Sequence, residues 1–304
     1  MAPQTNRNGI PYVRTPEARF ADMPDFPYEP GYVDVDGFRM AFIDEGPRDA
    51  TTLLLLHGEP TWSYLYRRMI PTFLAAGLRV VAPDIIGFGR SDKPTERSAY
   101  TYAGHVAWMT EFLASQGLSD LTLFCQDWGG LIWLRVAAEM PDLFARLVIA
   151  NTALPDGSAM SEGFMMWQNA SQAMNFMDCG TMLQRATQAR ELTEAEMNAY
   201  RAPFPDEEHM AGARQFPLLV PTSPDDPAVP ANLAAWKVLE SWTSPVLTLW
   251  APGDMVLGAY QQGFLDRIPG TKGQPHQTFA PAGHFVQDDC GEDLAEAVVN
   301  WIRH

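Results

Sequence analysis

LFCQDWGGLIWL, Leu123–Leu134, is the most informative segment of the sequence for the fold. An apolar run typical of a buried strand ends at Gln126, and an equally apolar run of helical character begins at Gly129. The only charge in the stretch, Asp127, lies at the seam between the two. A strand, a sharp turn that carries one functional side chain and a helix that opens with small residues form a nucleophile elbow. The sequence therefore predicts Asp127 at the position of a nucleophile.

This elbow departs from its usual form at two positions. Cys125 stands where glycine is usual, and Asp127 stands where serine is usual. Aspartate is also a good N-cap residue for a helix, so this stretch alone leaves capping and catalysis both open.

The overall composition limits the class of protein. The 304 residues are 46% hydrophobic and 19% charged, which is enough for a large core. The net charge of −16 disfavours nucleic acid and anionic membranes as partners, because both require basic patches. We see neither a signal peptide nor an apolar run of about 18 residues. The three cysteines are at unrelated spacings and suggest free thiols, so we expect a cytoplasmic protein and, by default, a monomer.

Short apolar runs alternate with helical stretches along most of the chain, which is the pattern of a mostly parallel sheet flanked by helices. Strands are expected at 40–46, 52–57, 79–84, 121–126, 145–152, 245–253 and 276–283. Helices are expected at about 65–76, 102–116, 129–140 and 292–304.

The character of the sequence changes between about Ala153 and Pro230. This segment reads as helical, holds more than half of the 15 methionines and ends in a proline-rich connector at 214–230. An inserted helical subdomain explains the change better than two tandem domains do. We therefore expect a core of residues 1–152 and 231–304 with a cap of residues 153–230.

Other motifs supply partners for Asp127. After such an elbow the expected chain order is nucleophile, acid, histidine. His284 lies in a loop after the last strand, and Asp254 follows an earlier strand, with Asp266 and Asp288 as weaker substitutes for the acid. An oxyanion hole needs a backbone N–H from the loop after an early strand, and His57-Gly58-Glu59 lies in that place.

Two further patterns do not indicate a bound group. The glycine-containing stretch DIIGFGRSDKP, 84–94, has Asp92 where a dinucleotide fingerprint requires its third glycine. The remaining histidines, at positions 57, 105, 209 and 276, have no metal-ligand spacing. We expect neither a cofactor nor a metal.

Five motifs together resemble the α/β-hydrolase superfamily and, within it, the haloalkane dehalogenases with two halide-binding tryptophans. They are HGEPTWSYLYR (57–67), DIIGFGRSDKP (84–94), QDWGG (126–130), GDMVLG (253–258) and AGHFVQ (282–287). The resemblance covers the chain from about Val33 to its C-terminus and implies an α/β-hydrolase core with an inserted cap.

The resemblance also implies a role for each site residue. Asp127 would be the nucleophile, His284 the general base and Asp254 the acid that orients it. Backbone N–H groups of Glu59 and Trp128 would form the oxyanion hole. Trp128 and Trp167 would bind halide, although packing within the cap would equally account for Trp167. In a related subgroup an asparagine and a glutamate serve as halide ligand and acid; Glu59 and Asn151 hold those places here, which favours Asp254 and Trp167.

An aspartate nucleophile suits one kind of chemistry. A serine that attacked a saturated carbon would leave an ether, whereas a carboxylate leaves an ester whose carbonyl water can attack. The resemblance then implies a small neutral haloalkane, water and the halide product as the partners.

Two rival functions remain at this stage. An epoxide hydrolase shares the aspartate nucleophile but needs two tyrosines in the cap, where Tyr200 is the only one. A non-catalytic ligand-binding protein on the same scaffold is the other rival, and retention of the three polar site residues argues against it.

Overall fold

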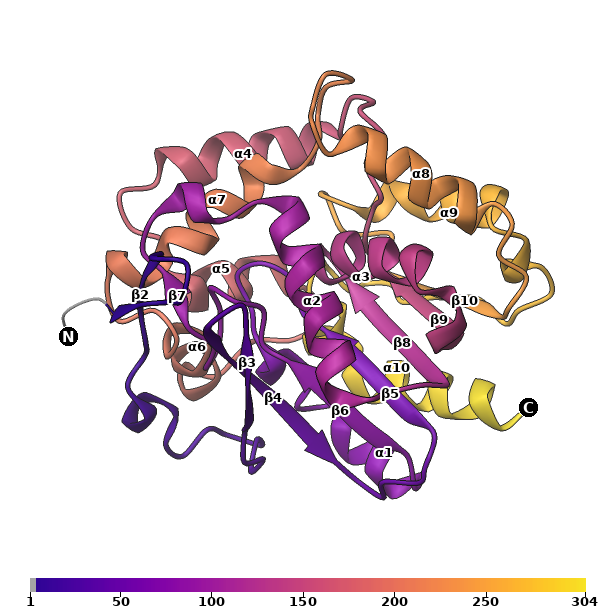
Figure 1. Ribbon diagram of the computed structural model, residues 1–304. Helices are drawn as coiled ribbons and strands as arrows, with labels where there is room; N and C mark the ends of the chain where they lie inside the picture. Colours follow the sequence, from indigo (N-terminus) through magenta and orange to yellow (C-terminus); the bar gives the residue numbers. More distant parts are fainter. Residues whose placement is uncertain (1–3) are drawn as a thin grey trace.

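The computed structural model describes residues 4–304 and consists of a central sheet covered by helices on both faces (Figure 1). Within these residues the main sheet has eight strands in the order β11-β10-β9-β8-β5-β6-β4-β3. The strands from β6 to β11 are parallel, and β4 and β3 join antiparallel at one edge. Their bounds are β3 Gly31–Val35, β4 Phe38–Glu45, β5 Thr52–Leu56, β6 Arg79–Pro83, β8 Leu121–Gln126, β9 Phe144–Ala150, β10 Val246–Trp250 and β11 Gln277–Thr278.

The central strands form because they are apolar on both faces. Every residue of β5, β8 and β10 is buried, as expected for parallel strands that have helices on either side. A small separate sheet of β1 Gln4–Thr5, β2 Pro11–Val13 and β7 Lys93–Pro94 packs at the periphery.

Helices cover both faces of the main sheet (Figure 1). On one face α2 packs beside α3 and α3 beside α8, and α1 and α10 pack together on the other. These helices and α9 have the bounds α1 Ile70–Ala75, α2 Tyr102–Gln116, α3 Trp128–Glu139, α8 Val229–Leu239, α9 Gln261–Arg267 and α10 Val286–Arg303.

Four helices between β9 and α8 lie beyond the carboxyl ends of the parallel strands (Figure 1). They are α4 Glu162–Ala173, α5 Cys179–Ala186, α6 Glu194–Arg201 and α7 Ala211–Leu219, and we call them the cap helices. The division into a core of 1–152 and 231–304 and a cap of 153–230 stays a proposal, with α8 assigned to the core because it packs on α3.

Several expected elements differ in the structure. The helix expected at 65–76 is a 3₁₀ turn, Ser63–Tyr66, followed by α1, whose start is set by a proline in its first turn. Part of the expected connector 214–230 is helical, because α7 tolerates Pro217 close to its C-terminal end. The last helix begins at Val286 rather than 292 and contains a non-helical residue, Cys290. The strand expected at 276–283 is limited to β11.

Glycines at the elbow allow α3 to approach the sheet. A Cβ at Gly129 would collide with the carbonyl oxygen of Leu56, at the end of β5. A Cβ at Gly130 would collide with the side chain of Thr152, just after β9. The helix therefore starts in contact with two neighbouring strands, and only glycine leaves room for that contact.

We predict that Gly129→Ala lowers the free energy of unfolding by about 3 kcal/mol or more, because a backbone carbonyl cannot move aside as a side chain can. The matched control is Gly263→Ala in α9, where an added Cβ meets nothing within 4 Å. That change should be neutral or stabilise by up to about 1 kcal/mol. Chemical denaturation of both variants is the measurement, and equal stability of the two would contradict the packing argument.

Candidate active site

Asp127 occupies the turn between β8 and α3 with a backbone φ of 52° and ψ of −132°. A positive φ is unusual for a residue with a side chain and marks a strained turn. The carboxylate makes no capping bond to α3. Instead, its Oδ1 accepts a hydrogen bond of 2.8 Å from the backbone N–H of Glu59. Capping, which the sequence left open, therefore does not account for Asp127.

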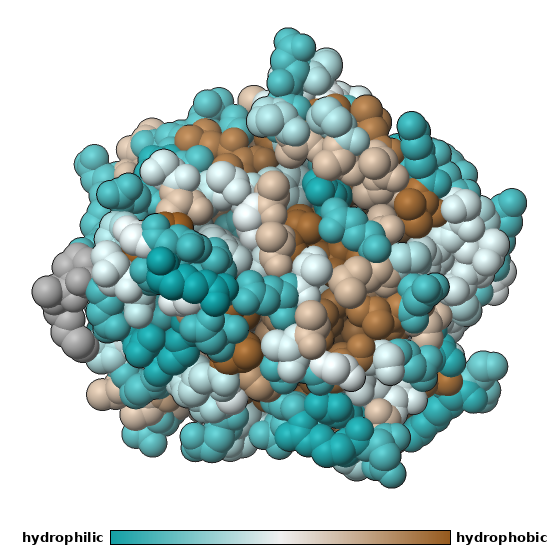
Figure 2. All heavy atoms as spheres, viewed as in Figure 1, coloured by the Kyte–Doolittle hydropathy of each residue, from teal (hydrophilic) through white to brown (hydrophobic). Residues whose placement is uncertain are grey.

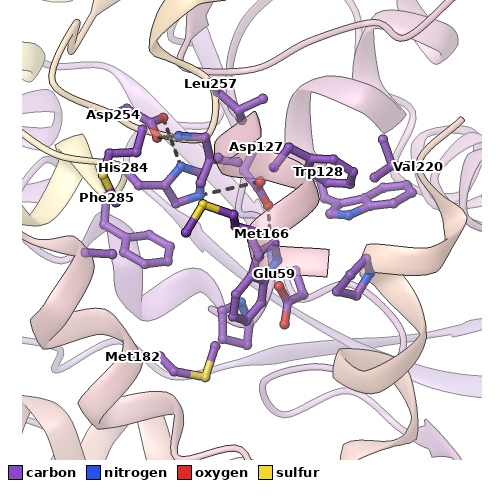
Figure 3. Close-up of a pocket in the computed structure, with 18 of the residues that line it drawn as sticks. Glu59, Asp127, Trp128, Met166, Met182, Val220, Asp254, Leu257, His284 and Phe285 are labelled. Atoms are coloured by element: carbon purple, nitrogen blue, oxygen red, sulfur yellow. Dashed lines mark hydrogen bonds and ion pairs between the residues drawn. The ribbon is translucent and has the colours of Figure 1, made fainter. Parts of the chain in front are cut away.

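His284 lies between the carboxylates of Asp127 and Asp254 (Figure 3). Its Nδ1 is 2.9 Å from Asp254 Oδ2, and its Nε2 is 3.5 Å from Asp127 Oδ2. The structure thus brings together the three residues that the sequence analysis placed in a triad. The two weaker substitutes lie elsewhere: Asp266 accepts a bond from Gln262, and Asp288 binds Arg67 and Tyr200.

Asp254 is held in place by two further groups. Asn151, which follows β9, donates its Nδ2 to Asp254 Oδ2 at 3.0 Å, and the backbone N–H of Val256 donates to Oδ1 at 2.8 Å. Burial alone would raise the pKa of Asp254, but the charge and hydrogen bond of His284 hold it below its ordinary value. Sequence reasoning did not assign this positioning role to Asn151, because its bond to Asp254 joins residues that are 103 positions apart.

Charges on both sides set the protonation of His284. Burial favours its neutral form, yet the two carboxylates, Asp254 and Asp127, together raise its pKa well above the ordinary value. The imidazole in the resting site is therefore stabilised in its cationic form.

An apolar cavity of about 430 Å³ opens in front of Asp127. Met166 and Met255 line it and are also 70% and 80% exposed, which places them at its mouth. Apolar side chains also gather in a hollowed region on the face of the molecule where the cap helices meet the core (Figure 2). Further residues along the cavity wall are Met160, Phe164, Met174, Met182, Val220, Leu257 and Phe285.

Trp128 and Trp167 both line the cavity. Trp128 is fixed by ring contacts with Tyr102 and Phe216, at centroid distances of 5.2 and 4.7 Å. Neither Trp128 nor Trp167 donates its indole N–H to an atom of residues 4–304, in contrast to Trp236 and Trp250, which bind carbonyl oxygens. Both indole N–H groups are thus without a partner among the described residues.

The side chain of Glu59 also lines the cavity, next to Asp127 (Figure 3). It is 5% exposed, and its Oε1 has no hydrogen-bond partner among the described residues. Burial, together with the negative charge of Asp127, raises the pKa of Glu59 well above its ordinary value. The sequence predicts a role only for the backbone N–H of this residue, in the oxyanion hole. The structure adds a buried carboxyl group that favours its neutral form beside the nucleophile.

Comparison with known proteins identifies the family. A model of the alpha/beta hydrolase fold matches residues 51–289. A haloalkane dehalogenase of Psychrobacter cryohalolentis is 51% identical over 297 residues, which cover 96% of this chain and 98% of that protein. This chain belongs to the haloalkane dehalogenases. A haloalkane dehalogenase of Mycobacterium marinum is 48% identical and covers 95% of this chain and 99% of its own length.

Solved structures of dehalogenases share the fold. The tetrameric haloalkane dehalogenase of Paraglaciecola agarilytica NO2 superposes with a TM-score of 0.87 at 39% identity, over 94% of this chain and 96% of that one. The dehalogenase of Bradyrhizobium elkani USDA94 has a TM-score of 0.78 at 26% identity, over 90% and 97% of the two chains. The predicted α/β-hydrolase fold and the predicted family are thereby confirmed.

Two other classes of site are not found among the described residues. Among residues 4–304 no group of three or more His, Cys, Asp or Glu side chains is arranged to hold a metal ion. No helix in the same part of the chain has the length and apolar character needed to cross a membrane.

The raised pKa of Glu59 gives a prediction for stability. In the unfolded chain Glu59 ionises above its ordinary pKa of 4.5, whereas in the folded protein it keeps its proton to a higher pH. The free energy of unfolding therefore falls as the pH rises toward the pKa of the folded state. Glu59→Gln removes this loss of stability. The stability of the variant relative to the parent should therefore increase from pH 5 to pH 8, by up to about 1.4 kcal/mol per unit.

Denaturation at a series of pH values is the measurement for this prediction. Glu296→Gln, at an exposed position of α10, is the matched control for the same exchange away from the cavity. A difference between Glu59→Gln and the parent that stays constant with pH would show that the pKa of Glu59 is not raised in the folded protein.

Proposed function

We propose that this dehalogenase hydrolyses a small neutral haloalkane to an alcohol, a halide ion and a proton through an alkyl ester on Asp127. The observation that carries the proposal is the line of Asp254, His284 and Asp127 at the wall of an apolar cavity. The backbone N–H of Glu59 donates to Oδ1 of the nucleophile, and Oδ2 lies 3.5 Å from His284 Nε2.

In the first step Oδ2 of Asp127 attacks the carbon that bears the halogen. A C–O bond forms, the C–halogen bond breaks, and the halide leaves with the bonding electron pair. A carboxylate nucleophile needs no general base for this displacement. The unpaired indole N–H groups of Trp128 and Trp167 would donate to the departing halide in a cavity lined mostly by apolar side chains.

In the second step His284 removes a proton from water, and the resulting hydroxide adds to the carbonyl carbon of the ester. Oδ1 becomes the oxyanion, already positioned on the N–H of Glu59, with the N–H of Trp128 proposed as a second donor. The intermediate then expels the alkoxide, which takes the proton from His284 and leaves as the alcohol. The carboxyl group of Asp127 then gives its proton to His284, and both groups return to their starting states.

The first step would prepare His284 for the second. In the resting site the charges of Asp254 and Asp127 both raise the pKa of His284. Ester formation neutralises Asp127, so one of these two causes disappears and the pKa of His284 falls once the halide has left. The imidazolium then loses its proton to solvent, which leaves the neutral imidazole that can accept a proton from water.

The rival functions have less support. Tyr200, the one tyrosine of the cap segment, is fully buried and donates its hydroxyl to Asp288, so it does not face the cavity. An epoxide hydrolase would lack both proton donors. A non-catalytic binding protein would require neither the strained turn at Asp127 nor an imidazole aligned with it.

Two broader expectations also remain proposals. The three cysteines are free thiols, which suits a reducing compartment such as the cytoplasm. A monomer remains our default for this chain, although the relative from Paraglaciecola agarilytica is described as tetrameric. Sedimentation of the purified protein distinguishes the two assemblies.

We predict that His284→Gln still allows the displacement step but blocks ester hydrolysis, because glutamine cannot accept the proton from water. Incubation with 1-bromobutane should then add the mass of one butyl group to the intact protein, on the peptide that contains Asp127. An unmodified mass would contradict the two-step mechanism.

Two control variants accompany this experiment. The double variant with Asp127→Ala should form no adduct, and Asp127→Ala alone should lose at least about four orders of magnitude in bromide release. Asp142→Ala, at an exposed position, should keep the activity of the parent.

We predict that Trp167→Phe weakens binding of bromide by about 10-fold to 100-fold, since a hydrogen bond to a charged group contributes about 1.5–3 kcal/mol. Quenching of the remaining tryptophan fluorescence measures the affinity. Trp301→Phe is the control, because the indole of Trp301 binds Gln274 and does not line the cavity. Equal affinity in the two variants would assign Trp167 to packing alone.

A further inference from the structure

A buried carboxylate outside the catalytic site joins the general base to the cap. Asp289 lies in the first turn of α10, five positions after His284, and is 8% exposed. Its Oδ2 accepts the backbone N–H of Gly283, the residue before His284, at 2.7 Å. Its Oδ1 accepts the N–H of Gln188 at 2.9 Å and the N–H of Ala189 at 2.5 Å. One side chain thus binds two segments that are almost 100 residues apart in sequence.

The same two segments also touch each other directly. The backbone N–H of His284 donates to the carbonyl oxygen of Ala186, at the end of cap helix α5, at 3.1 Å. An added Cβ at Gly283 would collide with that same carbonyl oxygen. The loop that carries the base therefore packs against residues 186–189, and Asp289 accepts backbone N–H groups from both segments.

The neighbouring Asp288 makes a second connection to the cap. It accepts bonds of 2.5 Å from Arg67 and from the hydroxyl of Tyr200 in α6, and Arg67 also binds Glu196 of α6 at 2.7 Å. Fully buried charges of this kind are held in place by several partners at once. The start of α10 is therefore fixed to the cap at two sites, and the segment that carries His284 is attached to this start.

We propose that Asp289 is a positioning residue that couples the cap to the general base. Its carboxylate holds Gly283 and residues 188–189 together. The His284 imidazole therefore reaches the position of the general base only while residues 188–189 of the cap are bound to Asp289. Asp289 touches neither the imidazole nor the reacting atoms, and its charge-assisted bonds to backbone N–H groups are the kind that hold a loop firmly. This inference rests on the proposed function of His284 as the base for ester hydrolysis.

The coupling affects the two chemical steps differently. Displacement by Asp127 needs no base, so it depends little on the exact place of the imidazole. Ester hydrolysis needs the imidazole against the attacking water. A loosened Gly283 should therefore slow the second step selectively, and the alkyl ester should accumulate.

Asp289→Asn tests the proposal. The amide removes the charge and offers one acceptor oxygen in place of the two that now bind three N–H groups. In single turnovers with 1-bromobutane, followed by rapid quenching and intact mass, ester hydrolysis should slow at least 10-fold, while ester formation changes less than 3-fold. Asp293→Asn, at an exposed position of the same helix, should match the parent in both steps.

Three outcomes would overturn the proposal: an equal loss in both steps, which indicates a purely structural role; a loss confined to ester formation; or no change in either step. If Asp289→Asn does not fold, Asp289→Glu keeps the charge but displaces it and should show the same selective slowing to a smaller degree. In the parent enzyme, amide hydrogen exchange should be slow in both 186–190 and 282–285, and rapid exchange in either segment would also overturn the proposal.

This test can be separated from that of the proposed function. Ester formation in His284→Gln depends on Asp127 and not on Asp289. If that variant forms no ester, the mechanism fails. If it forms the ester while Asp289→Asn leaves hydrolysis unchanged, only the coupling through Asp289 fails.

Discussion

The hydrogen bond from the backbone N–H of Glu59 to Oδ1 of Asp127 is the contact on which the site depends. It exists because β5 and β8 are parallel neighbours, with Leu56 in register with Cys125, so the loops after both strands meet at one edge of the sheet. β9 and β10 continue the same edge and bring Asn151 and Asp254 to it. The strand order thus assembles, from four separate loops, a nucleophile, an N–H donor and an oriented acid.

The electrostatics of the site follow from placing several ionisable groups in one largely apolar cavity. Asp254 is kept ionised by His284, and His284 gains its high pKa from the carboxylates on either side. Glu59, which lacks a cationic partner in contact with it, responds in the opposite direction and favours its neutral form. Within one cavity the carboxyl groups of Asp254 and Glu59 thus favour different charge states, and the neighbours of each group determine which state is favoured.

The sequence was sufficient to predict features that depend on local pattern. The elbow around Asp127 has a strand, a turn and a glycine-led helix in immediate succession, and His284 and Asp254 follow in the expected order after recognisable strands. The resemblance to the family then supplied Trp128 and Trp167, which both line the cavity. Their roles in binding halide remain predictions.

Features that depend on contacts between distant segments could not be predicted in this way. The bond of Asn151 to Asp254 and the bonds of Asp289 to the cap link positions about 100 residues apart, and no local pattern marks either residue. The unpaired carboxyl of Glu59 is visible only once its burial is known. Helix α7 was missed because Pro217 and its neighbours resemble a connector, whereas packing against α4 retains the helix.

A single turnover in water enriched in oxygen-18 tests whether Asp127 forms a covalent ester with the substrate. With enzyme in excess over 1-bromobutane, hydroxide from labelled water attacks the carbonyl carbon of the ester. The label should then enter the carboxyl group of Asp127, as detected in the peptide that contains it, and the butanol from this first turnover should be unlabelled. Label in the butanol with none in the Asp127 peptide would show direct attack of water on the substrate and would rule out the ester.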